Sequence, residues 1–241
     1  MRTYPAKDIK RGRMSWLIYG KSRAGKTALI GTFRPPIVIT NFPNENGVVT
    51  LMGHSEVTVY EIEKVQDAVD FPTWVFEENK RRVEAGLEPF GTVAVDSLTS
   101  WLELYQQELG HSLRIPTDLP LIAKWSQEIT LTVDRLRPLD AEKVFTANLS
   151  LNKDEVTGEQ HGGPDLFKSL ASRLPRKVDA TVIMESGSTL GQGGIQIVTR
   201  KAWLISKDGM PGGIRGACGA PFVEEPSYSK ILAEMGGALF D

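Results

Sequence analysis

Short apolar runs alternate with longer segments of helical periodicity through most of the chain. The runs are nearly continuous in apolar residues, as expected for strands that are buried on both faces of a sheet. The predicted strands are Met14–Tyr19, Ile37–Thr40, Thr92–Val95, Val144–Ala147 and Ala180–Met184. The predicted helices are Lys26–Phe33, Val65–Ala85, Leu98–Leu109, Ile122–Leu136 and Leu166–Leu174. This alternation predicts an α/β fold with a mostly parallel central sheet flanked by helices.

Three other segments carry a weaker pattern. Thr58–Ile62 alternates weakly and is predicted as a further strand at an edge of the sheet. Ile195–Thr199 and Ala202–Ile205 are predicted to form a C-terminal β hairpin or meander. Asn152–Pro164 contains three glycines and has no periodicity, so we predict a mobile loop there.

Composition narrows the class of protein. Of 241 residues, 41% are apolar and 24% are charged, which is the balance of a globular chain. We find no internal repeat and expect a single domain over 1–241, with a basic N-terminal segment at 1–13 and a C-terminal tail at 216–241. The net charge of −2 provides no long-range attraction for nucleic acid. The single cysteine, Cys218, excludes an intrachain disulfide and a zinc cluster. The sequence contains neither a signal peptide nor an apolar run of roughly 18 residues, so we expect a cytoplasmic protein with no membrane partner.

A glycine-rich segment directly after the first predicted strand matches the pattern G-x-x-x-x-G-K-[ST] in full. Its backbone N–H groups would surround the phosphates of a nucleotide, with Lys26 on the β- and γ-phosphates and the Thr27 hydroxyl on magnesium. ATP and magnesium are therefore the expected cofactors. The residues expected to contact them are Gly20, Lys21, Ser22, Arg23, Ala24, Gly25, Lys26, Thr27 and Ala28.

An acid at the end of another buried strand should complete the metal site. Asp96 directly follows the predicted strand Thr92–Val95 and would hold magnesium opposite Thr27. Asp96 is also placed to cap the N-terminus of the helix that begins at Leu98, and the two roles are compatible.

Two further polar residues follow predicted strands. Glu45 lies just after Ile37–Thr40, and we predict that it is the carboxylate that orients the attacking water; the alternative is a solvated loop acid. Asn148 ends the strand Val144–Ala147 and is predicted to sense the γ-phosphate; the alternative is a turn-forming asparagine. Lys26, Glu45, Asp96 and Asn148 are thus the predicted catalytic residues.

Together these motifs resemble the RecA-type ATPase core, and specifically the short bacteriophage RecA-like proteins of single-strand annealing and recombination. The resemblance runs from Trp16 to about Arg215 and is strongest in Gly20–Thr27 and in Val93-Ala94-Val95-Asp96-Ser97. It implies ATP hydrolysis, assembly into a homo-oligomeric ring or filament, and single-stranded DNA as partner. For a phage-encoded protein the compartment would be the host cytoplasm.

The resemblance also implies roles for basic residues late in the chain and in two loops. Lys207 and Arg215 are where residues that act on a neighbouring subunit's nucleotide are expected, the alternative being surface charge. The DNA-contacting segments would be Gly110–Leu119 and Asn152–Pro164. The candidate DNA contacts are Arg114 and Lys153 in these two segments and Lys168 in the helix that follows the second one.

Two other classes of function stay open. One is a small-molecule kinase, although such enzymes usually carry a lid with several arginines and Asn152–Pro164 has none. The other is a nucleotide-dependent switch or assembly factor that binds only protein. The net charge of −2 is compatible with both.

Overall fold

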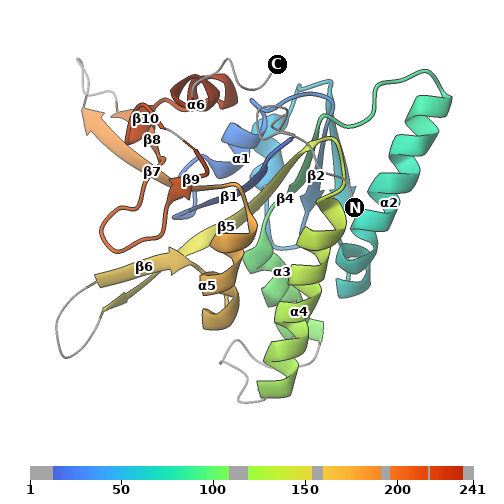
Figure 1. The fold of residues 1–241 in the computed structure, drawn as a ribbon, viewed down its shortest axis with the longest axis horizontal. Coiled ribbons are helices and arrows are strands. Elements are labelled where there is room, and N and C mark those ends of the chain that lie inside the picture. The colour runs from blue at the N-terminus through green and yellow to red at the C-terminus, as the bar shows by residue number, and fades with distance from the viewer. Residues whose placement is uncertain (1–12, 109–118, 154–159, 191–195, 217, 236–241) are drawn as a thin grey trace, which may run out of the picture.

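A ten-stranded, mostly parallel sheet runs through the molecule and has helices on both faces (Figure 1). The computed structural model describes residues 13–108, 119–153, 160–190, 196–216 and 218–235. The strands are β1 Ser15–Gly20, β2 Ile37–Asn41, β3 Val57–Glu61, β4 Thr92–Val95, β5 Glu142–Lys153, β6 Gln160–Pro164, β7 Ala180–Leu190, β8 Gln196–Trp203, β9 Gly213–Ile214 and β10 Phe222–Glu224. The helices are α1 Lys26–Ile30, the 3-10 helix η2 Gly47–Leu51, α2 Val65–Glu84, α3 Leu98–Glu108, α4 Leu119–Leu136, α5 Lys168–Lys177 and α6 Tyr228–Glu234.

The strand order is β10-β8-β7-β1-β5-β4-β2-β3, with β6 added to β5 and β9 to β7. The six strands from β7 to β3 in this order are mutually parallel. β8, β10, β6 and β9 pair antiparallel with their neighbours. The predicted α/β fold with a mostly parallel sheet is therefore confirmed, and β3 lies at the edge predicted for it.

Each face of the sheet has its own apolar core, because side chains alternate along a strand. Leu17 and Tyr19 of β1 belong to the cluster under α2, α3, α4 and α5. Trp16 and Ile18 belong to the opposite cluster, with residues of α1 and α6. The four central residues of β1, from Trp16 to Tyr19, therefore all need to be apolar, which is why this part of the sequence is a continuous apolar run.

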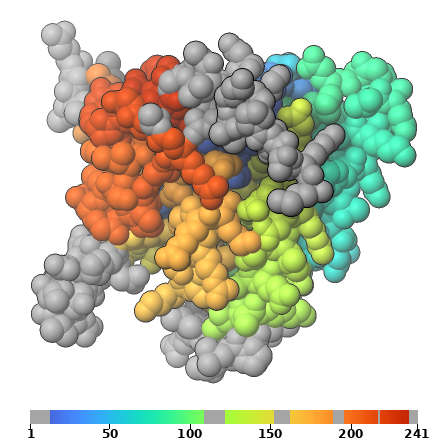
Figure 2. Space-filling model, viewed as in Figure 1, coloured from blue at the N-terminus to red at the C-terminus, as the bar shows by residue number. Residues whose placement is uncertain are grey.

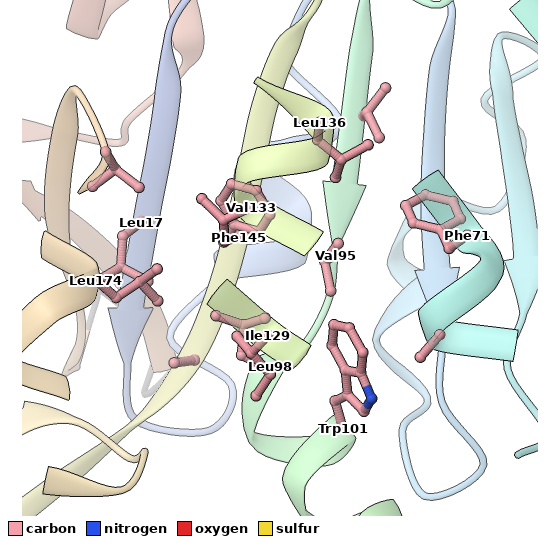
Figure 3. Packing of buried hydrophobic residues seen from close by; sticks show 14 of the residues in the cluster. Leu17, Phe71, Val95, Leu98, Trp101, Ile129, Val133, Leu136, Phe145 and Leu174 are labelled. Carbon is pink, nitrogen blue, oxygen red and sulfur yellow. The ribbon is translucent and has the colours of Figure 1, made fainter. Parts of the chain in front are cut away.

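The larger core is packed beneath the four helices of one face, α2, α3, α4 and α5. Val133 of α4 lies over the strand residue Phe145, and Leu174 of α5 lies near Leu17 (Figure 3). In the space-filling view α5 and α4 lie side by side over this face, with α2 beyond them (Figure 2). Among the described helices, none combines the length and apolar character that crossing a bilayer requires.

The predicted C-terminal meander is present as the antiparallel strands β7, β8 and β10, but two details of the strand prediction were wrong. Residues 160–164 form β6, which pairs with the end of β5, so the predicted loop Asn152–Pro164 is in part a hairpin arm. β6 is held by backbone hydrogen bonds to β5, and its sequence has no alternation of apolar and polar residues that would predict a strand. The two segments Ile195–Thr199 and Ala202–Ile205 are mostly one strand, β8, which pairs with β7 over eight residues. Arg200 and Lys201 interrupt its apolar pattern and hide this continuity.

Candidate functional site

The site lies where parallel strands of the sheet end together. β1 pairs with β5, with Gly20 opposite Asn148, and β5 pairs with β4, which ends directly before Asp96. β2 pairs with β4 on its other side, and its following loop contains Glu45. The carboxyl ends of neighbouring parallel strands share one edge, so the fold gathers the residues that the sequence marked separately.

The glycine-rich loop connects β1 to α1 with two residues in left-handed backbone conformations. Gly25 has φ of 93° and Arg23 has φ of 63°. The buried Lys26 ammonium donates to the carbonyl oxygens of Gly20 and Lys21, each at 3.1 Å, and to Asn148 Oδ1 at 3.0 Å. Burial lowers the pKa of Lys26, and the nearby carboxylates partly oppose this. The lysine is thus held at the base of the loop.

Asp96 is buried among hydroxyl groups. Thr27 Oγ1 donates to Asp96 Oδ2 at 2.6 Å, and the Thr146 hydroxyl donates to Oδ1. Burial raises the pKa of Asp96, the charge of Glu45 raises it further, and the two hydroxyl donors lower it. The backbone N–H of Ser100, in the first turn of α3, donates to Ser97 Oγ at 3.2 Å. This turn of the helix is therefore bonded to Ser97, and the carboxylate of Asp96 is directed to the phosphate loop.

The Thr27–Asp96 pair has the chemistry and the space that a magnesium ion requires. Hydroxyl and carboxylate oxygens are ligands that magnesium prefers. Gly47, at the start of η2, lies beside them: a Cβ at this position would come 2.7 Å from Thr27 Oγ1 and 3.6 Å from Asp96 Oδ2. Because Gly47 has no side chain, the space next to both oxygens is left open. The residues present therefore fit a magnesium ion.

Glu45 is held toward the same cavity. Its Oε1 accepts hydrogen bonds from Ser97 Oγ at 2.8 Å and from the Ser100 hydroxyl, both in or next to the first turn of α3. These bonds fix the carboxylate in one orientation, which a solvated loop acid would not have. Ser97 and Ser100 carry no signal in the sequence that would mark them as its partners, because they lie on a different element.

Asn148 is fixed by its backbone as well as by Lys26. Its N–H donates to Thr99 Oγ1 at 2.9 Å, and that hydroxyl donates to the carbonyl of Asp165 at 3.1 Å. Because β5 continues beyond it to Lys153, Asn148 lies within a strand and is not a turn residue.

A cavity of about 580 Å³ connects these groups. Its wall includes Lys26, Thr27, Glu45 and Asp96, together with residues that the sequence did not mark. One of these is Arg200 of β8, which in the sequence is only a charged residue inside an apolar segment. Others are Glu103 and Thr50. Burial and the charges of two nearby acids raise the pKa of Glu103.

The basic residues expected to act on a neighbouring subunit lie away from this cavity and have partners in their own chain. Lys207 pairs with Glu185 and lies over the ring of Trp203, 4.5 Å from its centroid. Arg215 donates to the carbonyl of Arg176 at 2.8 Å and lies 3.7 Å from an oxygen of Asp179.

The candidate DNA contacts are only partly described. Arg114 and most of Gly110–Leu119 lie outside the described residues. Lys153 is the last residue of β5 and pairs with Gln160 of β6. Lys168 is exposed at the start of α5, in the wall of a second cavity of about 1040 Å³.

The comparisons with known proteins agree with this geometry. The sequence from residue 13 to residue 215 matches the family model described as an AAA domain, a family of P-loop NTPases. A search of curated proteins found no match. Since the family match extends over well more than half of the chain and includes the whole cavity described above, the chain belongs to the AAA domain family of P-loop NTPases.

Proposed function

We propose that the chain binds ATP with magnesium and hydrolyses it. The observation that carries this proposal is the convergence of Lys26, the Thr27–Asp96 pair and Glu45 on one cavity. These groups follow three different strands, β1, β4 and β2, and the fold itself does not require charged side chains to meet at this point. Phosphoryl transfer depends on positioning and charge stabilisation, which is what such a set supplies.

Each residue has a separate part in the proposed reaction. The loop N–H groups and Lys26 bind the phosphates, while Thr27 and Asp96 would hold magnesium, which would neutralise part of the phosphate charge. Glu45 accepts a proton from a water as the water oxygen bonds to the γ-phosphorus. The bond from that phosphorus to the bridging oxygen breaks, and ADP leaves with the electron pair.

The test is ATP turnover by the purified chain, measured as phosphate release with magnesium and with excess chelator. We expect turnover that the chelator removes, and a Lys26→Ala variant that remains folded at the assay temperature but has no turnover. Turnover at an unchanged rate in Lys26→Ala would refute the proposal, because the activity would then belong to another site or to a contaminant.

We further propose that the protein is RecA-like and assembles on single-stranded DNA to act in recombination or annealing. The residue-level resemblance supports this, and so does the course of β5. That strand includes Asn148, which touches Lys26, and continues into the arm that it forms with β6. Glu103 lies in the wall of both the nucleotide cavity and the larger cavity near Lys168. In this proposal β5 and Glu103 would couple a change at the phosphates to the candidate DNA surface.

The test of this finer proposal compares ATP turnover with and without single-stranded DNA, together with the mass of the assembly in each state. We expect DNA to stimulate turnover and to promote larger assemblies. A monomer that hydrolyses ATP at the same rate with and without DNA would refute the DNA role and favour a switch or kinase. The proposed ATPase activity would not be affected by that result.

A further inference from the structure

Arg200 reaches the phosphate loop of its own chain from the far side of the cavity. It lies on β8, opposite Ser186 of β7, and its side chain extends over the loop. A Cβ built on Gly25 would lie 2.7 Å from both Cδ and Nε of Arg200. The arginine therefore packs directly on the loop glycine that precedes Lys26.

The guanidinium of Arg200 has an unused donor at this place. Its Nε is buried and makes no hydrogen bond with any of the described residues. Buried donors in folded proteins nearly always have a partner. The side chain lines the same cavity as Lys26 and Thr27, so this donor belongs to a site with room for a ligand.

The backbone of Arg200 is fixed by the C-terminal segment. Its N–H donates to Glu225 Oε1 at 2.9 Å, and its carbonyl accepts from the Glu225 N–H at 2.9 Å. Glu225 has φ of 44°, and its own carbonyl accepts from Lys230 Nζ at 2.8 Å. Both bonds use backbone atoms of Arg200, so they can hold this position of β8 whatever side chain stands at residue 200.

We propose that Arg200 is a phosphate-binding residue that acts in cis on a nucleotide bound at Gly20–Thr27, an inference that rests on the proposed ATP function. A guanidinium presents several donors in a planar fork that suits phosphate oxygens, and it stays charged at every relevant pH. Contact with Gly25, next to Lys26, places it toward the β- and γ-phosphates. Arg200 thus joins Lys26 and Arg23 as a cation in the wall of this cavity, which also contains the carboxylates of Glu45, Asp96 and Glu103.

The experiment measures the affinity for ATP and for ADP of four chains: unmodified, Arg200→Ala, Arg200→Lys and Lys201→Ala. Lys201 is the matched control, since it is the adjacent cation and pairs with Glu224 at 3.0 Å instead of lining this cavity. We expect Arg200→Ala to weaken ATP binding about 10-fold to 100-fold, the range for losing a hydrogen bond to a charged group. Arg200→Lys should recover part of the affinity, and Lys201→Ala should stay within about twofold of the unmodified chain.

Thermal unfolding of the same four chains separates binding from folding. We expect Arg200→Ala to unfold within a few degrees of the unmodified chain, because its backbone bonds to Glu225 remain. ATP affinity that Arg200→Ala leaves unchanged would overturn the assignment of Arg200 alone. An equal loss in Lys201→Ala would also overturn it, since a general charge effect would then suffice. An unmodified chain that binds no nucleotide would overturn the proposed function, and this inference with it.

Discussion

Replacing Glu45 by glutamine changes one atom of the proposed water-binding group and leaves its supports in place. The two serine hydroxyls donate to Oε1 alone, so the amide oxygen of glutamine can accept both bonds. The amide nitrogen then takes the place of Oε2, which accepts no bond from the described residues. The variant should fold as the unmodified chain does and lose only the ability to accept a proton.

The expected effect is a decrease in kcat of about 10²–10⁴, the range for a lost general base. At 1.36 kcal/mol for each factor of ten, this is about 3–5 kcal/mol of activation free energy. ATP affinity should stay the same or increase slightly. The charge of Glu45 raises the pKa of Asp96, so removing it favours the ionised carboxylate that magnesium requires.

Single-turnover hydrolysis with protein in excess isolates the chemical step, and titration with a fluorescent ATP analogue gives the affinity. Glu56→Gln is the matched control, because Glu56 is an exposed acid just before the edge strand β3. A kcat for Glu45→Gln within about threefold of the control would refute the reasoning. In that case the base would be another group, although the binding site would stand.

Three further predictions concern the same site and the candidate DNA surface. Lys26→Ala should lose phosphate release completely while circular dichroism shows that it remains folded at the assay temperature. Gly47→Ala should weaken magnesium-dependent ATP binding about 10-fold to 100-fold, because the new methyl group would displace Thr27 Oγ1, 2.7 Å away, and break a hydrogen bond to a charged group. Gly53→Ala is the control: it has φ of 88° and nothing within 4 Å, so it should cost about 1–2 kcal/mol of stability and leave magnesium dependence unchanged. Equal magnesium titrations of the two variants would contradict this account. Arg114→Ala combined with Lys153→Ala should weaken single-strand binding, with a salt dependence reduced by about 0.7 in log–log slope for each lost phosphate contact, while turnover without DNA is retained. An unmodified chain that binds no single strand at low salt would remove the basis for this variant pair.

The sequence predicted the central part of the fold because its two signals are the apolar strand segments and the glycine-rich motif. Each of these is contained in one continuous stretch of sequence. Val93–Val95 and Leu17 lie in strands buried on both faces, so the apolar runs alone mark them. The phosphate loop is equally local, since one continuous segment contains the whole motif. In the structure the parallel pairing of β1, β5, β4 and β2 brings the ends of these strands, with their predicted site residues, to one edge of the sheet.

The rest of the site is not local and could not be predicted in this way. Ser97 and Ser100 contact Glu45 across more than fifty positions of sequence, and hydroxyl side chains on a helix have many other uses. Arg200 reaches Gly25 from a strand whose apolar pattern it interrupts. In β6, backbone pairing replaces the side-chain pattern on which strand prediction depends. The contacts of Glu45 and Arg200 depend on distant partners that a single sequence does not identify.

The position of β5 sets the order in which a growing chain can become functional. β1 and β4 end in the phosphate loop and in Asp96, yet they are not neighbours, because β5 lies between them and pairs with both. A ribosome that has completed residue 97 has thus made both halves of the proposed magnesium site without the strand that joins them. Roughly 50 residues separate Asp96 from Asn148 in the sequence, which takes about 3–10 s at usual rates of synthesis. On the proposed function, we therefore expect ATP to stabilise only those chains that are long enough to include β5.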